Sequence, residues 1–141
     1  MNRSAPWRIG ALTAIVLMLS ACFMTPSPVF TELSDPQEPG DLLPKRVPGN
    51  VDPGSTRFVG TLDGTEFYLD ISADPGMRGG PCIIHYDGLS DGTGCGASGG
   101  EVTVEWVDFG SARYLPPASA GLELPQGWTR ISTNLIVKPA A

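Results

Sequence analysis

The sequence is poor in the residues that metal-dependent and nucleic-acid-binding proteins need. Its 141 residues include one histidine and three cysteines, and 9 basic against 15 acidic side chains give a net charge of −6. Catalytic zinc needs about three protein ligands, mostly His or Cys, and one histidine cannot supply them. Nucleic acids and anionic headgroups both require clustered Lys or Arg. We therefore expect no cofactor and no nucleic-acid partner.

The sequence also lacks a long apolar run. Its most apolar stretch, residues 9–19, is shorter than the roughly 20 residues that a membrane-spanning helix needs. Arg3 and Arg8 precede this stretch, and the small residues Ser20 and Ala21 follow it. A basic start, a short apolar middle and small residues at the end are typical of a secretory signal peptide.

The end of this segment reads Leu19-Ser20-Ala21-Cys22. It resembles the lipobox of bacterial lipoproteins, in which a leucine and two small residues precede an obligatory cysteine. The resemblance covers only the first 22 residues. It implies that residues 1–21 are a signal peptide, that the Cys22 thiol receives a diacylglycerol, and that the new amino group can receive a fatty acid such as palmitate. An uncleaved transmembrane helix and a signal peptide cut at another position are the alternatives.

A lipid on Cys22 would place the protein at a membrane. One acyl chain gives marginal binding at ~0.8 kcal/mol per buried methylene, whereas two or more hold a soluble domain on a bilayer. The resemblance therefore implies a lipid-anchored protein on the extracytoplasmic side of the cell membrane or the outer membrane.

The two remaining cysteines are Cys82 and Cys95. If Cys22 carries the lipid, both lie in an oxidising compartment, where thiols pair. A disulfide that closes a loop of this length stabilises a fold by roughly 3 kcal/mol because it restricts the unfolded chain. Two free thiols or a metal pair are the alternatives, and His85 is the only histidine that could join such a metal. We predict a Cys82–Cys95 disulfide.

The composition changes near residue 55. Residues 22–54 are rich in proline and poor in large apolar residues, which predicts a disordered tether behind the lipid. From residue 55 to 141 the hydrophobic residues recur at period two, and no ten-residue stretch has a capped helical pattern. We therefore expect a small all-β domain: an antiparallel sheet, sandwich or partly open barrel of five to seven strands with one disulfide.

Several strands can be placed from this alternation. Residues 57–62 and 66–72 are joined by Asp63-Gly64, a favoured dipeptide for a type I′ hairpin turn, and should pair. In the second strand Phe67 is expected inside and Tyr68 toward water. Further strands are expected at residues 82–86, 101–109 and 129–138, with short edge strands near Tyr114 and residues 122–124.

The glycine-rich stretch from residue 87 to 100 has no apolar periodicity and predicts one long loop. Asp87 and Asp91 lie in it among glycines, and carboxylates so spaced can wrap oxygen ligands around Ca²⁺. The stretch lacks the spacing of an EF-hand, and Asp-Gly pairs are ordinary turn residues. A calcium-binding module is therefore kept as an alternative function.

A hydrolase and an aromatic binding surface are further possibilities. His85 lies near Asp87 and Ser90, the residue types of a catalytic triad, but no Gly-x-Ser-x-Gly elbow is present. Tyr68 and Tyr114 are candidates for a surface that binds a sugar or peptide. No catalytic residue is assigned. The expected function is that of a non-enzymatic lipoprotein whose β domain binds an envelope protein or glycan.

Overall fold

Strands dominate the part of the chain that the computed structural model describes, which comprises residues 30–44, 51–74, 76, 79–97, 101–119 and 121–141. The strands are β1 (Arg57–Leu62), β2 (Thr65–Ile71), β3 (Pro81–Tyr86), β4 (Asp91–Cys95), β5 (Val102–Trp106), β6 (Gly110–Tyr114), β7 (Thr129–Arg130) and β8 (Leu135–Pro139). Short 3-10 helices are η1 (Thr31–Leu33), η2 (Pro39–Asp41) and η4 (Pro117–Ser119). None of the helices in these described ranges has the length and apolar character to span a membrane.

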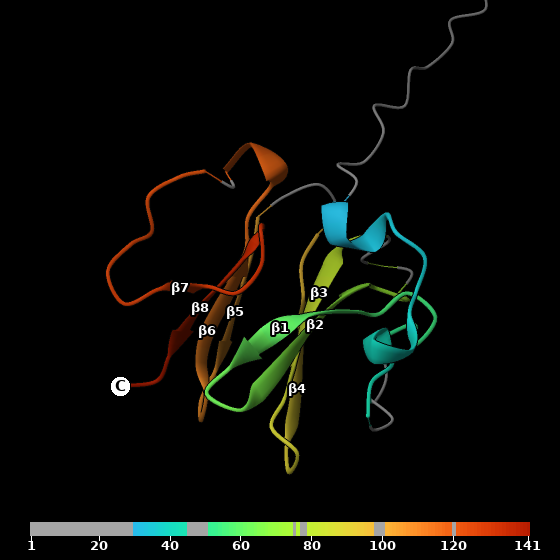
Figure 1. The fold of residues 1–141 in the computed structure, drawn as a ribbon, viewed down its shortest axis with the longest axis horizontal. Coiled ribbons are helices and arrows are strands. Elements are labelled where there is room, and N and C mark those ends of the chain that lie inside the picture. Colours follow the sequence, from blue (N-terminus) through green and yellow to red (C-terminus); the bar gives the residue numbers. More distant parts are fainter. Residues whose placement is uncertain (1–29, 45–50, 75, 77–78, 98–100, 120) are drawn as a thin grey trace, which may run out of the picture.

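The strands form two four-stranded antiparallel sheets, in the orders β1-β2-β3-β4 and β5-β6-β8-β7 (Figure 1). The predicted all-β class is confirmed, with eight strands in the described part where five to seven were expected. The first hairpin is confirmed as well, since Leu62 pairs with Thr65 across the turn. Asp63 and Gly64 have φ of 51° and 84°, as a type I′ turn requires.

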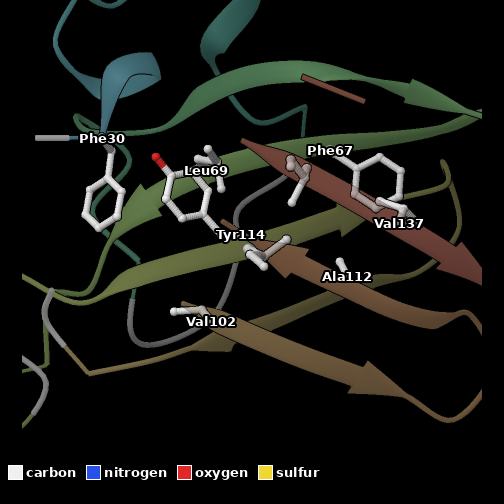
Figure 2. Close-up of a cluster of buried hydrophobic side chains, with 9 residues drawn as sticks. Phe30, Phe67, Leu69, Val102, Ala112, Tyr114 and Val137 are labelled. Atoms are coloured by element: carbon white, nitrogen blue, oxygen red, sulfur yellow. The ribbon is translucent and has the colours of Figure 1, made fainter. Parts of the chain in front are cut away.

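The hydrophobic core lies between the two sheets (Figure 2). The alternation predicted for β5 is confirmed, because Val102 belongs to the core, and Val104 and Trp106 pack against it. The buried members are Phe30, Phe67, Leu69, Ile83, Val102, Ala112, Tyr114, Leu135 and Val137.

Tyr114 lies inside this core. It is fully buried, and β6, which ends at Tyr114, lies between β5 and β8 rather than at a sheet edge. The Phe30 ring contacts the Tyr114 ring edge-on at a centroid distance of 4.9 Å. The Tyr114 hydroxyl donates to Glu32 Oε2 at 3.3 Å. The prediction that Tyr114 lies on an edge strand and on a binding surface is therefore wrong. Residues that precede the predicted domain cover Tyr114.

The second face of β2 is also buried. Tyr68 is 2% exposed and clusters with Val51 and Ile84, so the expectation that it faces water is wrong. Its hydroxyl donates to Glu66 Oε2 at 2.8 Å. The physical reason is that residues outside the predicted β domain pack over this face, which no alternation within the strand reveals.

Those covering residues come from the predicted tether. Residues 30–44 and 51–54 pack against the sheets, with Phe30 only 6% exposed in the core. The Arg57 guanidinium donates to the Asp35 carbonyl at 2.6 Å. The prediction of a disordered tether is therefore wrong for these residues, because contacts with distant strands order a segment that cannot bury itself. The rest of the predicted tether lies outside the described residues.

Asp70 holds part of this segment in place. It is fully buried on β2; its Oδ2 accepts a hydrogen bond from the Asp52 backbone N–H at 3.0 Å, and its Oδ1 accepts one from the Ser55 hydroxyl. Burial raises the pKa of Asp70 above its ordinary value of 3.8, although the hydrogen bond from Ser55 acts in the opposite direction. The carboxylate is therefore a contact whose strength depends on pH.

Replacing Asp70 by asparagine should remove this pH dependence. As pH rises from about 4 through the raised pKa of Asp70, the contribution of Asp70 to the stability of the protein falls. In this range the unfolded state has already released the Asp70 proton, whereas the folded state still holds it. The asparagine side chain cannot ionise but keeps an oxygen for the Asp52 N–H. We expect urea unfolding at a series of pH values to show Asp70→Asn gaining stability relative to the wild type as pH rises. A difference that stays constant would contradict this, and Asp63→Asn, in an exposed turn, is the control.

Residues 91–95 of the glycine-rich stretch form a strand rather than part of the long loop that was predicted, and residues 98–100 lie outside the described residues. β4 pairs with β3 along its whole length, from Asp91 opposite Tyr86 to Cys95 opposite Cys82. The predicted Cys82–Cys95 disulfide is confirmed and joins directly paired residues of the two strands, with a Cα–Cα distance of 4.0 Å. Only a short turn, residues 87–90, separates the strands.

The glycines of β4 allow the two sheets to approach closely. Gly92 and Gly94 of β4 and Gly96 directly after it alternate along the chain, so they lie on one face. A Cβ on Gly94 would lie 2.2 Å from a methyl carbon of Val104, and one on Gly96 would lie 2.4 Å from a methyl carbon of Val102. The side chains of β5 thus occupy the space above the glycines, and β4 needs no apolar side chains of its own.

The last predicted strand, residues 129–138, is divided in two. β7 and β8 pair as a hairpin, and the Ile131 backbone N–H donates to the Leu135 carbonyl at 2.9 Å. Asn134 is fully buried in the turn, and its Nδ2 donates to the Leu115 carbonyl at 2.8 Å. The polar residues 132–134 therefore form a turn, and this turn separates β7 from β8. Residues 122–124, expected as an edge strand, are outside any strand.

Candidate functional site

Three hairpin turns lie at one end of the sandwich: residues 63–64, 87–90 and 107–109 (Figure 1). The first two turns share an end because Glu66, just after the first turn, pairs with Tyr86, just before the second. The third turn follows Trp106, whose ring contacts His85 at a centroid distance of 4.6 Å. We call these three turns the hairpin end.

Phe30 lies at the opposite end. It contacts Tyr114, which pairs with Val102 at the start of β5, whereas the hairpin end follows the last residue of β5. The described chain therefore begins at one end of the sandwich and presents its three turns at the other (Figure 1).

An open pocket of about 250 Å³ lies at the hairpin end, between the turn of residues 87–90 and the turn of residues 107–109. We call it the His85 pocket. Residues from both sheets line it, namely His85, Asp87, Ser90, Asp91, Gly92, Trp106, Val107, Asp108 and Phe109.

His85 forms the most buried wall of this pocket, at 6% exposed. Its imidazole stacks on Phe109 at 4.9 Å and meets Trp106 edge-on. The rings of His85 and Trp106 lie close to Gly92. A Cβ at Gly92 would be 2.3 Å from His85 Nε2 and 2.7 Å from Trp106 Nε1. Burial lowers the pKa of His85, although the charges of Asp87 and Asp91 oppose this effect. The imidazole is therefore neutral at neutral pH.

Two polar atoms of this wall are unsatisfied. Within the described residues, His85 Nδ1 and Trp106 Nε1 are buried and have no hydrogen-bond partner. Most buried polar atoms in proteins are hydrogen-bonded, and an unsatisfied one costs about 1–3 kcal/mol. Such a cost often marks a functional position.

Asp87 organises the turn beside the pocket. Its Oδ1 accepts hydrogen bonds from the backbone N–H groups of Leu89 at 2.8 Å and Ser90 at 2.6 Å, and its Oδ2 accepts one from the Ser90 hydroxyl at 2.8 Å. These bonds lower the pKa of Asp87 to about 2. The carboxylate is thus charged across the physiological range.

The two turns beside the pocket each carry one highly exposed apolar side chain, and we call this pair the apolar rim. Leu89 is 91% exposed in one turn and Val107 is 98% exposed in the next, and Val107 also lines the pocket. Large apolar side chains gathered near a polar pocket are typical of surfaces that bind other molecules. Sequence reasoning did not find Val107 or Asp108, because only the tertiary fold brings their turn beside His85.

The triad residues meet in one pocket but do not form a catalytic arrangement. The Ser90 hydroxyl donates to Asp87, and within the described residues Nδ1 of His85 has no partner. A nucleophilic mechanism needs the hydroxyl to be hydrogen-bonded to the base, and the base to an orienting acid. The geometry therefore does not support a hydrolase.

The calcium hypothesis required a loop that does not form. Asp91 begins β4, and Asp87 directs its oxygens to its own turn. The described part of the chain contains no group of three or more His, Cys, Asp or Glu side chains that could hold a metal ion. Cys22 lies outside the described residues, and Tyr68 and Tyr114 are buried away from this surface.

Comparison with known proteins adds no relative: no protein-family model, no curated protein and no solved structure matches the chain significantly.

Proposed function

We propose that the chain is a lipoprotein anchored through Cys22 on the extracytoplasmic side of a bacterial cell envelope. On this proposal, the β sandwich is a non-enzymatic module that binds a partner through its hairpin end. The observation that carries the binding role is the His85 pocket, where two buried polar atoms have no hydrogen-bond partner among the described residues and the adjoining turns carry two highly exposed apolar side chains.

The position of Phe30 supports this arrangement. Phe30 follows Cys22 by eight residues, which can span at most about 30 Å when fully extended. Because Phe30 lies at the end opposite the turns, an anchor on Cys22 would favour orientations in which the hairpin end is directed away from the bilayer (Figure 1). The disulfide is consistent with this location, since disulfides persist in oxidising compartments.

The apolar rim suggests how the binding role can be tested. Replacing Leu89 and Val107 by serine should reduce cross-linking of a partner in detergent-solubilised envelopes at least tenfold, because burial of each such side chain contributes about 1.5–3 kcal/mol. Both side chains are more than nine-tenths exposed, so the fold should not change. Quantitative mass spectrometry of cross-linked, affinity-purified protein measures the loss.

Leu122→Ser is the matched control. Leu122 is an apolar side chain that is 64% exposed and does not line the His85 pocket. A partner whose capture survives Leu122→Ser but is lost with the rim variant supports the proposal. Equal capture by the rim variant and the wild type would contradict it.

A further inference from the structure

The charge of the His85 pocket points to the ligand that it takes. Three of its lining residues are carboxylates, Asp87, Asp91 and Asp108, and the lining residues in the described part of the chain include no lysine or arginine. His85 is neutral because burial lowers its pKa. A pocket lined by charge of one sign concentrates ligands of the opposite sign, so this pocket favours a cation and disfavours an anion.

The size and walls of the pocket restrict that cation further. A volume of about 250 Å³ is below the roughly 300–1,000 Å³ of pockets for drug-sized molecules, so the space fits a group the size of one side chain. Trp106 and Phe109 contribute aromatic surface, which attracts ammonium and guanidinium groups. These features select the basic head and apolar stem of a lysine or arginine.

The two unsatisfied atoms favour a ligand that offers both a donor and an acceptor, which reaches them when the ring of His85 or Trp106 turns to admit it. A neutral imidazole has one acceptor nitrogen, which the N–H of a cationic group can satisfy. The Trp106 indole is only a donor and needs an acceptor. A free polyamine has no acceptor, whereas a peptide offers a backbone carbonyl beside its basic side chain. The exposed Leu89 and Val107 give such a peptide an apolar surface to contact.

We infer that the His85 pocket binds a lysine or arginine side chain presented by a partner protein. This inference rests on the proposed binding role and identifies the chemistry of the partner: an exposed basic residue with apolar neighbours, docked at the hairpin end between the turns of residues 87–90 and 107–109.

Small probes test the inference on the full chain purified in detergent. N-acetyl-arginine amide and N-acetyl-lysine amide should shift the NMR signals of the Trp106 indole N–H and the His85 imidazole. The citrulline analogue, which has the shape of arginine without its charge, should not. Raising the salt concentration should weaken binding, because the attraction is between charges at a surface.

Substitutions at the pocket provide the second measurement. Asp91→Asn combined with Asp108→Asn keeps the shape of both side chains and should weaken binding of the arginine probe about tenfold, since each partly exposed ion pair contributes modestly. Asp63→Asn is the control, because this carboxylate lies at the hairpin end but outside the pocket. It should leave the affinity unchanged.

Four outcomes would overturn the inference: no binding of the arginine and lysine probes, equal binding of the citrulline analogue, unchanged binding by the double variant, or tighter binding of putrescine than of the arginine probe. These failures are separate from a failure of the proposed function. If the rim variant loses its partner while the probes do not bind, the hairpin end binds a partner of other chemistry. If the probes bind but capture of no partner requires Leu89 and Val107, the pocket does bind basic side chains, and the proposal that the hairpin end binds a partner protein through its apolar rim is wrong.

Discussion

Replacing Cys22 by serine is expected to abolish acylation of the protein completely. Serine has no thiol to carry the diacylglycerol that the resemblance of Leu19-Ser20-Ala21-Cys22 to a lipobox implies. Cells grown with labelled palmitate should incorporate the label into the wild type and not into Cys22→Ser. Intact-mass analysis of the wild type should show a chain that begins at Cys22 and carries acyl groups.

The other two cysteines provide the control for this experiment. Cys82 and Cys95 are joined in a disulfide within the first sheet, so the Cys82→Ala, Cys95→Ala double variant should still incorporate palmitate. Residues 1–21 still attached to the wild type, or an unmodified Cys22 thiol, would contradict the lipoprotein proposal. Two or more acyl chains are needed to hold a soluble domain on a bilayer, so the mass also reports whether the anchor is sufficient.

Parts of the fold were predictable because their signal is local. The Asp63-Gly64 turn has the dipeptide that positive φ at two successive residues favours, and β5 alternates apolar and polar side chains at period two. The Cys82–Cys95 pairing followed from the number of cysteines and from the oxidising compartment that the lipobox resemblance implies. Each of these inferences needs only neighbouring residues or a count.

The wrong predictions concern features that depend on contacts between residues distant in sequence. Tyr68 was expected to face water, but Val51, from outside the predicted domain, packs against it. The candidate site depends on distant residues in the same way: His85 and Asp87 are close in sequence, whereas Trp106 and Asp108 reach the pocket from the second sheet. Tertiary contacts of this kind leave no periodicity in a single sequence, so only the folded chain shows the pocket.

The strand β4 was not predicted because it has glycines where apolar side chains would alternate, and side chains of β5 fill the space above them. This explanation predicts a large effect of Gly94→Ala. The new Cβ would lie 2.2 Å and 2.5 Å from the two methyl carbons of Val104, so the sheets would have to separate or Val104 would have to move. Overpacking of this kind costs about 1–3 kcal/mol, and a rigid contact between two sheets belongs at the upper end. We expect urea unfolding of Gly94→Ala to show a free energy of unfolding about 3 kcal/mol below that of the wild type.

Two further variants separate steric conflict from a general intolerance of alanine. Gly121→Ala places its Cβ where no heavy atom lies within 4 Å and should change the free energy of unfolding by less than about 0.5 kcal/mol. Val104→Ala is destabilising alone, because it leaves a gap, but removes the two methyl groups that conflict with the new Cβ. The Gly94→Ala, Val104→Ala double variant should therefore be more stable than the sum of the single effects by at least about 1 kcal/mol. Simple additivity would mean that Gly94 is required for its backbone and not for the close approach of β5, and the glycine-rich stretch would then need a different explanation.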